Sequence, residues 1–190
     1  MNKGKKIGII IIAIVAVLVI IYIICALTGN LKSAEETSNS DSSISSGESA
    51  EVFEFGWNPQ NAQSEQGTTA RVDEILLQSG NVAKQISEDQ AKSAWDEAFL
   101  YLKQHKEDFY ESSEVMEHAM YYGEFIYRYI ENNATASNIA ELTDSTRAAY
   151  DAGYNTVKAI KYVYCGAEKI EDESTQSALS EAKEALDKFQ

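Results

Sequence analysis

The chain has 190 residues, of which 44% are apolar and 24% charged, and its 30 acidic and 16 basic side chains give a net charge of −14. This length allows one domain with appendages or two small domains, and the composition is neither collagen-like nor disulfide-rich. The acidic balance argues against nucleic-acid binding, because the phosphates of a nucleic acid would be repelled.

The first clear element is an uncharged, apolar run over residues 7–27, which follows a stub at 1–6 that carries three lysines. A helix of about 21 residues spans about 31 Å, close to the hydrocarbon thickness of a bilayer. Because basic residues remain on the cytoplasmic side, the pattern predicts a single-pass membrane helix. We expect the N-terminus in the cytoplasm and the C-terminal domain on the extracytoplasmic side of the cell membrane.

Three other interpretations of this segment fit the sequence less well. A cleaved signal peptide has an apolar core of about 7–15 residues and a small-x-small cleavage site, which residues 24–26 do not supply. A lipoprotein signal has small residues directly before its modified cysteine, whereas Cys25 follows the bulky residues 22–24. A type IV pilin has a glutamate early in the apolar run, and none follows Gly4 or Gly8 in that position.

The two cysteines are far apart in the predicted topology. Cys25 falls within the membrane segment and Cys165 in the distal domain, so they are not expected to pair. We interpret Cys165 as a small packing residue at the edge of an apolar face, with a redox-active or dimerising thiol as the alternative.

Residues 28–67 are rich in serine and acidic residues and poor in apolar ones. Such a composition buries too little apolar surface to offset the entropy of ordering, so it predicts a flexible linker. About 40 residues of this kind have a root-mean-square span of about 35 Å.

An aromatic island at residues 52–59 interrupts this linker. Phe53, Phe55 and Trp57 alternate along the chain, so an extended backbone would place them on one face. Two interpretations are open: a strap that docks on the chain's own domain, or a short motif that binds a partner.

The segment 68–190 predicts an all-α domain. Apolar residues recur at helical spacing in five stretches, and short connections favour antiparallel neighbours, so we expect an antiparallel up-and-down bundle of four to five helices. Residues 87–90 (SEDQ) resemble a capping box at one helix start. The third helix is expected over 114–131, and the fourth is expected to start at Ser137 and run to about residue 168.

The sequence shows no recognised catalytic or phosphate-binding motif. The nearest metal candidates are Glu114, Glu117 and His118 with His105, but their spacing differs from that of carboxylate-bridged metal bundles. We therefore predict no metal, no cofactor and no enzymatic activity. Acidic pairs keep a hydrolase open as a less favoured interpretation.

The third helix offers the nearest approach to a functional surface. Phe125 falls outside the apolar arc of this helix, between His118 and Tyr121, so it requires a cover or a partner if neighbouring apolar surface makes it part of a larger patch. We predict a shallow groove with Phe125 at its base and His118 and Tyr121 at its rim. The candidate partner-binding residues are Phe53, Phe55, Trp57, His118, Tyr121 and Phe125.

These observations favour a membrane-anchored, extracytoplasmic helical binding or adaptor module at the cell envelope, non-catalytic in function. Its expected contacts are the membrane, through residues 7–27, and an envelope protein or glycan. The alternative is a self-associating structural or assembly component of the envelope, and a hydrolase of envelope polymers is less favoured.

Overall fold

A computed structural model of the chain describes residues 54–134 and 141–189. These residues form a 3-10 helix and five α-helices, without a strand among them. The elements are η1 (Pro59–Asn61), α2 (Thr69–Gln85), α3 (Glu88–His105), α4 (Ser113–Asn133), α5 (Asp144–Tyr164) and α6 (Glu173–Lys188). The predicted helical bundle is thereby confirmed.

The predicted membrane segment at residues 7–27 and most of the predicted linker lie outside the described residues. Within the described part, no helix combines the length and the hydrophobicity that crossing a membrane requires.

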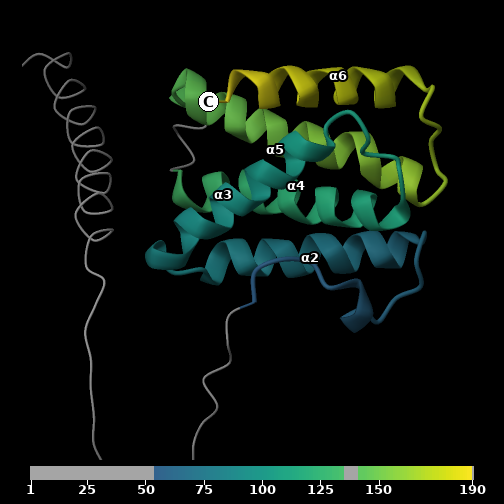
Figure 1. Cartoon of the computed structure of the whole chain (residues 1–190), viewed down its shortest axis with the longest axis horizontal. Coiled ribbons are helices and arrows are strands. Elements are labelled where there is room, and N and C mark those ends of the chain that lie inside the picture. Colours follow the sequence, from purple (N-terminus) through teal and green to yellow (C-terminus); the bar gives the residue numbers. More distant parts are fainter. Residues whose placement is uncertain (1–53, 135–140, 190) are drawn as a thin grey trace, which may run out of the picture. The chain divides into compact units, whose positions relative to one another are not determined.

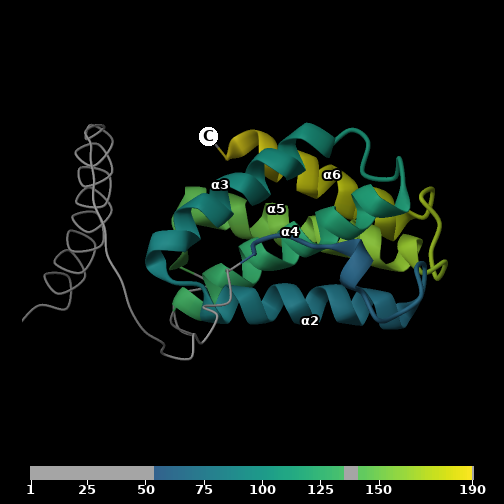
Figure 2. The same ribbon diagram turned by 60° about the horizontal axis from the view of Figure 1, so that its bottom comes forward.

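Helix α4 is the centre of the bundle and contacts α2, α3 and α5, while α6 packs on α5 and reaches α3 (Figure 1). Three successive pairs of helices are therefore neighbours, as expected from short connections. Helix α2 departs from the expected order, because its main neighbour is α4 and not α3. Residues 54–67, which we call the strap, run across α4 between α2 and α3 (Figure 2).

The packing of α4 against α5 depends on two glycines, Gly123 and Gly153. A Cβ atom on Gly153 would lie 2.5 Å from the carbonyl oxygen of Gly123, and one on Gly123 would lie 2.8 Å from that of Gly153. Only glycine allows the two backbones to approach so closely. Both glycines therefore lie in the seam between α4 and α5.

Side chains cap most helix starts in the expected way. Thr68, Ser112 and Thr143 each accept a hydrogen bond from a backbone N–H of the first turn. The capping box expected at residues 87–90 marks the start of α3 correctly, but its bonding is different. The Ser87 hydroxyl donates to Gln90 Oε1 at 2.9 Å and makes no bond to the backbone.

Helix α5 is shorter than the helix expected over 137–168. It starts at Asp144 because Thr143 has a non-helical ψ of 156° and acts as its N-cap. Residues 135–140 lie outside the described part, so Ser137 is not placed. The helix ends at Tyr164, since Gly166 has a φ of +71° and reverses the chain. Cys165 caps this end and packs, half-buried, against the core.

Candidate functional site

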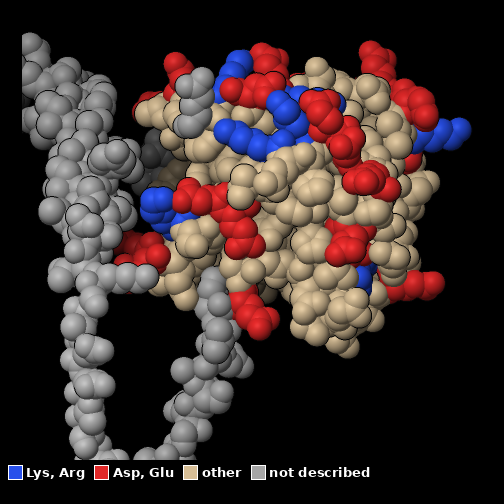
Figure 3. Space-filling view, viewed as in Figure 1, with Lys and Arg blue, Asp and Glu red and all other residues tan. Residues whose placement is uncertain are grey.

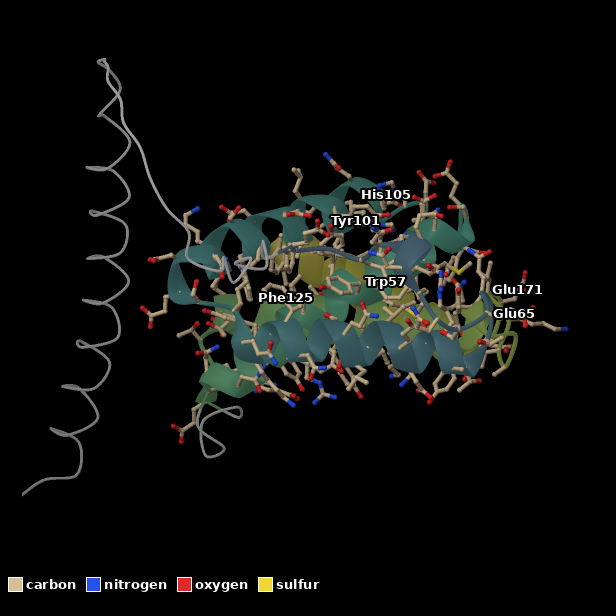
Figure 4. The ribbon with its side chains drawn as sticks, turned by 90° about the horizontal axis from the view of Figure 1, so that it is seen from below. Trp57, Glu65, Tyr101, His105, Phe125 and Glu171 are labelled. Carbon is tan, nitrogen blue, oxygen red and sulfur yellow. The ribbon has the colours of Figure 1, made fainter. Side chains whose placement is uncertain are left out.

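The strap turns its aromatic side chains onto α4. The Phe55 ring lies 4.7 Å from that of Phe125, and the Trp57 ring lies 6.3 Å from that of Tyr121, both between centroids. Phe125 is fully buried and Trp57 is only 4% exposed. Figure 4 shows Trp57 and Phe125 in the interior of the helical unit. The described part of the aromatic island, residues 54–59, therefore packs on the chain's own domain.

The buried carboxylate of Glu117 on α4 joins four parts of the fold. It is 0% exposed, and it accepts hydrogen bonds from Trp57 Nε1 at 2.7 Å and from Arg71 Nε at 3.0 Å. The hydroxyl of Tyr164 donates to the same carboxylate. The strap, α2, α4 and α5 thus meet at one side chain, which the sequence had suggested only as a metal candidate.

Arg71 extends this network to the backbone of the strap. Its Nη1 donates to the carbonyl of Ser64 at 3.0 Å, and its Nη2 donates to that of Pro59 at 3.3 Å. The guanidinium carbon also lies 5.1 Å from the centre of the Trp57 ring, which is a cation–π distance. Arg71 therefore holds the strap at several points along its length.

The protonation of this network follows from burial and from its hydrogen bonds. Burial alone would raise the pKa of Glu117, but the hydrogen bonds from Arg71, Tyr164 and Trp57 outweigh it, and the pKa lies below its usual range. Burial, together with the hydrogen bond to Glu117, raises the pKa of Tyr164 to about 12. The network therefore holds an ionised carboxylate beside a neutral phenol.

The structure places the sequence-predicted site residues as follows. Four of them, Phe55, Trp57, Tyr121 and Phe125, come together beneath or within the strap, and Phe53 lies outside the described residues. His118 is half-buried at the edge.

The shallow groove expected over Phe125 is not what the structure shows. Phe125 is fully buried and Tyr121 is only 2% exposed, because Phe55 covers them. The position of Phe125 outside the apolar arc predicted that this residue needs a cover, and the strap supplies that cover.

An open groove remains beside the strap, with a volume of about 610 Å³. Tyr122 on α4 forms one wall, and its hydroxyl donates to Glu97 on α3 at 2.7 Å. Polar groups of the strap and α4 form the rim: Glu54, Asn58, Gln60, Gln66, Glu114 and His118. We call this feature the strap groove.

Tyr101 continues the aromatic surface onto α3. Its ring lies 5.0 Å from Tyr122, 5.6 Å from His118 and 4.4 Å from His105, between centroids. Tyr101 and His105 lie close together on α3 in Figure 4. Tyr101 and Tyr122 were not among the site residues predicted from the sequence, although the i,i+4 pairs Tyr101–His105 and His118–Tyr122 are visible there.

The four candidate metal ligands do not converge. Glu117 is fully buried and already bound by protein donors, and His118 Nδ1 lies 2.8 Å from the carbonyl oxygen of Glu114 in its own helix. The Tyr101 ring contacts both histidine rings. In the part of the chain that the structure describes, no three carboxylate, histidine or cysteine side chains are arranged to hold a metal ion.

Charged groups are dispersed over the face seen in Figure 3, where acidic and basic side chains are interspersed.

Comparisons of the chain with protein-family models, with curated proteins and with solved structures find no match.

Proposed function

We propose that this chain is a membrane-anchored, extracytoplasmic, non-catalytic binding or adaptor module, which presents the strap groove to an envelope protein or glycan. The observation that carries the proposal is the groove itself, since aromatic residues and polar residues line one open groove. Ligand sites commonly combine an aromatic or apolar wall with a few polar groups that fix orientation.

The placement of the strap supports a preformed binding surface. Trp57 and Arg71 fix the backbone from residue 57 to residue 64 against α2 and α4. A surface that is ordered before binding loses less conformational entropy when a partner docks. The strap would thus contribute to recognition through its rim, while its aromatic side chains serve the fold.

Two carboxylates are buried in the described part of the chain, and their contacts favour binding over catalysis. Glu117 is bound by Arg71, Trp57 and Tyr164, and Glu124 accepts from Tyr127 and from Arg128 Nε, the latter at 2.8 Å. A general acid or base needs a proton-transfer path to substrate. Both of these carboxylates are instead occupied by structural partners.

The anchor in this proposal is the apolar segment 7–27, with residues 1–6 in the cytoplasm. Because residues 54–67 pack on the domain, the predicted linker shortens to residues 28–53, which would let the helical domain reach partners within about 28 Å of its point of attachment. Such a tether raises the local concentration of the domain at the membrane without fixing its orientation.

The test is a binding comparison of three full-length proteins: wild type, Tyr101→Ala and Tyr162→Ala. Tyr101 lies beside the strap groove, whereas Tyr162 is 44% exposed and does not line it. Each protein, in detergent, is offered isolated envelope glycans and envelope proteins. We expect Tyr101→Ala to weaken capture about tenfold, as for an aromatic anchor, and Tyr162→Ala to match wild type. Equal capture by all three would contradict the proposal.

A further inference from the structure

A second groove, formed by α2, α4 and α5, is lined mainly by basic residues, although the chain as a whole is acidic. Its volume is about 440 Å³, and it shares no lining residue with the strap groove. The chain as a whole carries 16 basic and 30 acidic side chains. Four of the basic ones, Lys84, Arg128, Lys158 and Lys161, line this groove together with a single carboxylate, Glu124. We call it the basic groove.

The carboxylate does not neutralise the lysines of the basic groove. Glu124 is 2% exposed, and its oxygens accept from Arg128 Nε and the Tyr127 hydroxyl. Arg128 Nη1 also donates to Glu131 at 2.8 Å. The two carboxylates therefore fix the guanidinium, while its Nη2 has no protein acceptor among the described residues.

Several lysines outside the basic groove have a carboxylate partner, whereas the lysines that line it have none among the described residues. Lys106, Lys183 and Lys188 each form an ion pair with a carboxylate. Within the described residues, Lys84 and Lys158 make neither an ion pair nor a side-chain hydrogen bond. The amine of Lys161 lies 4.7 Å from the centre of the Tyr162 ring, without a carboxylate partner in the same residues.

Exposed apolar groups accompany these cations. Leu77 is 66% exposed and Tyr154 is 46% exposed, and both line the basic groove. Cations next to exposed apolar surface suit a ligand that carries an anionic group on a carbon framework.

We propose that the basic groove binds a phosphate ester, with the phosphate held by Arg128 and the three lysines and the remainder of the ligand against Leu77 and Tyr154. Phosphate offers several strong acceptor oxygens, which match an oriented guanidinium and mobile ammonium groups. The phosphate can belong to a soluble polyol phosphate or to a lipid headgroup, and the experiment separates these two sources.

The test measures how fast an amine-reactive reagent modifies individual lysines of the full-length protein, with mass spectrometry as the readout. One arm adds glycerol phosphate to protein in neutral detergent, at an ionic strength matched with chloride. The other arm compares nanodiscs of neutral phospholipid with nanodiscs that contain anionic phospholipid. Lys169 is the control, since it is exposed and lies outside the basic groove.

Slower modification of Lys84, Lys158 and Lys161 by glycerol phosphate, with Lys169 unchanged, would support a soluble ligand. Protection only in anionic nanodiscs would identify the lipid headgroup as the source. The double variant Lys84→Gln/Lys158→Gln should reduce the affinity for the protecting probe at least about tenfold. Absence of protection in both arms, equal protection of Lys169, or wild-type affinity in the double variant would overturn the proposal.

Discussion

Glu117 shows how one residue can determine the arrangement of a segment far away in sequence. Its carboxylate binds the indole of Trp57 and the guanidinium of Arg71, which lie 60 and 46 residues away along the chain. Desolvation makes a buried charge costly unless it is paired and hydrogen-bonded, and Glu117 meets both conditions. This role could not be predicted from the sequence alone, because the partners come from three separate elements.

Replacing Glu117 by glutamine should destabilise the fold by about 3–5 kcal/mol, because Arg71 would keep a buried charge without its counterion. The matched control is Glu111→Gln, which changes an exposed acid outside the network and should alter stability by less than about 0.5 kcal/mol. Urea unfolding of the full-length proteins measures both changes. A free energy of unfolding for Glu117→Gln within error of wild type would show that the network contributes nothing.

The same network predicts a pH dependence at both ends of the scale. The pKa of Glu117 is lowered from an ordinary 4.5, so its contribution is present above that value and is lost as the pH falls through the folded-state pKa. The pKa of Tyr164 is raised from 10.0 to about 12, so its contribution is present below 10.0 and is lost as the pH rises through about 12. Denaturant titrations across these two ranges should show stability falling at each end. A flat profile from the acid range to the alkaline one would contradict the assignment.

The sequence predicts the existence of the α-helices better than it predicts the residues at which they begin. Apolar periodicity located all five α-helices, because each buries a stripe against a neighbour. It failed at the start of α5, where Leu142 and Ile139 continued the apolar pattern although Thr143 caps the helix. Periodicity measures which residues prefer burial, whereas the first turn depends on local backbone geometry.

The close contact between α4 and α5 can be tested by comparing Gly153, which lies in it, with Gly80, a helical glycine outside it. Gly153→Ala should destabilise the domain by about 1–3 kcal/mol or more, because the new methyl group would meet backbone of α4. Gly80→Ala in α2 should be neutral or stabilising by about 0.5–1 kcal/mol, since a Cβ atom added there would have no neighbouring atom within 4 Å. Thermal unfolding of both variants tests the packing. Equal effects of the two substitutions would contradict the close approach of these helices.

At the scale of the whole molecule, the sequence predicted a helical bundle and left open whether the aromatic island docks on that bundle or on a partner. The neighbour order of the helices could not be predicted, because the strap occupies the position between α2 and α3 that a simple bundle would close (Figure 2). The strap groove depends on that insertion. Its wall at Tyr122 and the Tyr101 ring beside it come together only once α3 and α4 are packed against each other.

The central claim is that residues 54–67 belong to the folded domain and are held there by Glu117. Amide hydrogen exchange of the full-length protein tests it most directly, with a free peptide of the same residues as the reference. We expect strap amides to exchange much more slowly in the wild-type protein than in the peptide. In Glu117→Gln they should lose this protection before α4 and α5 do. Strap amides that exchange in the wild-type protein as fast as in the free peptide would contradict the account.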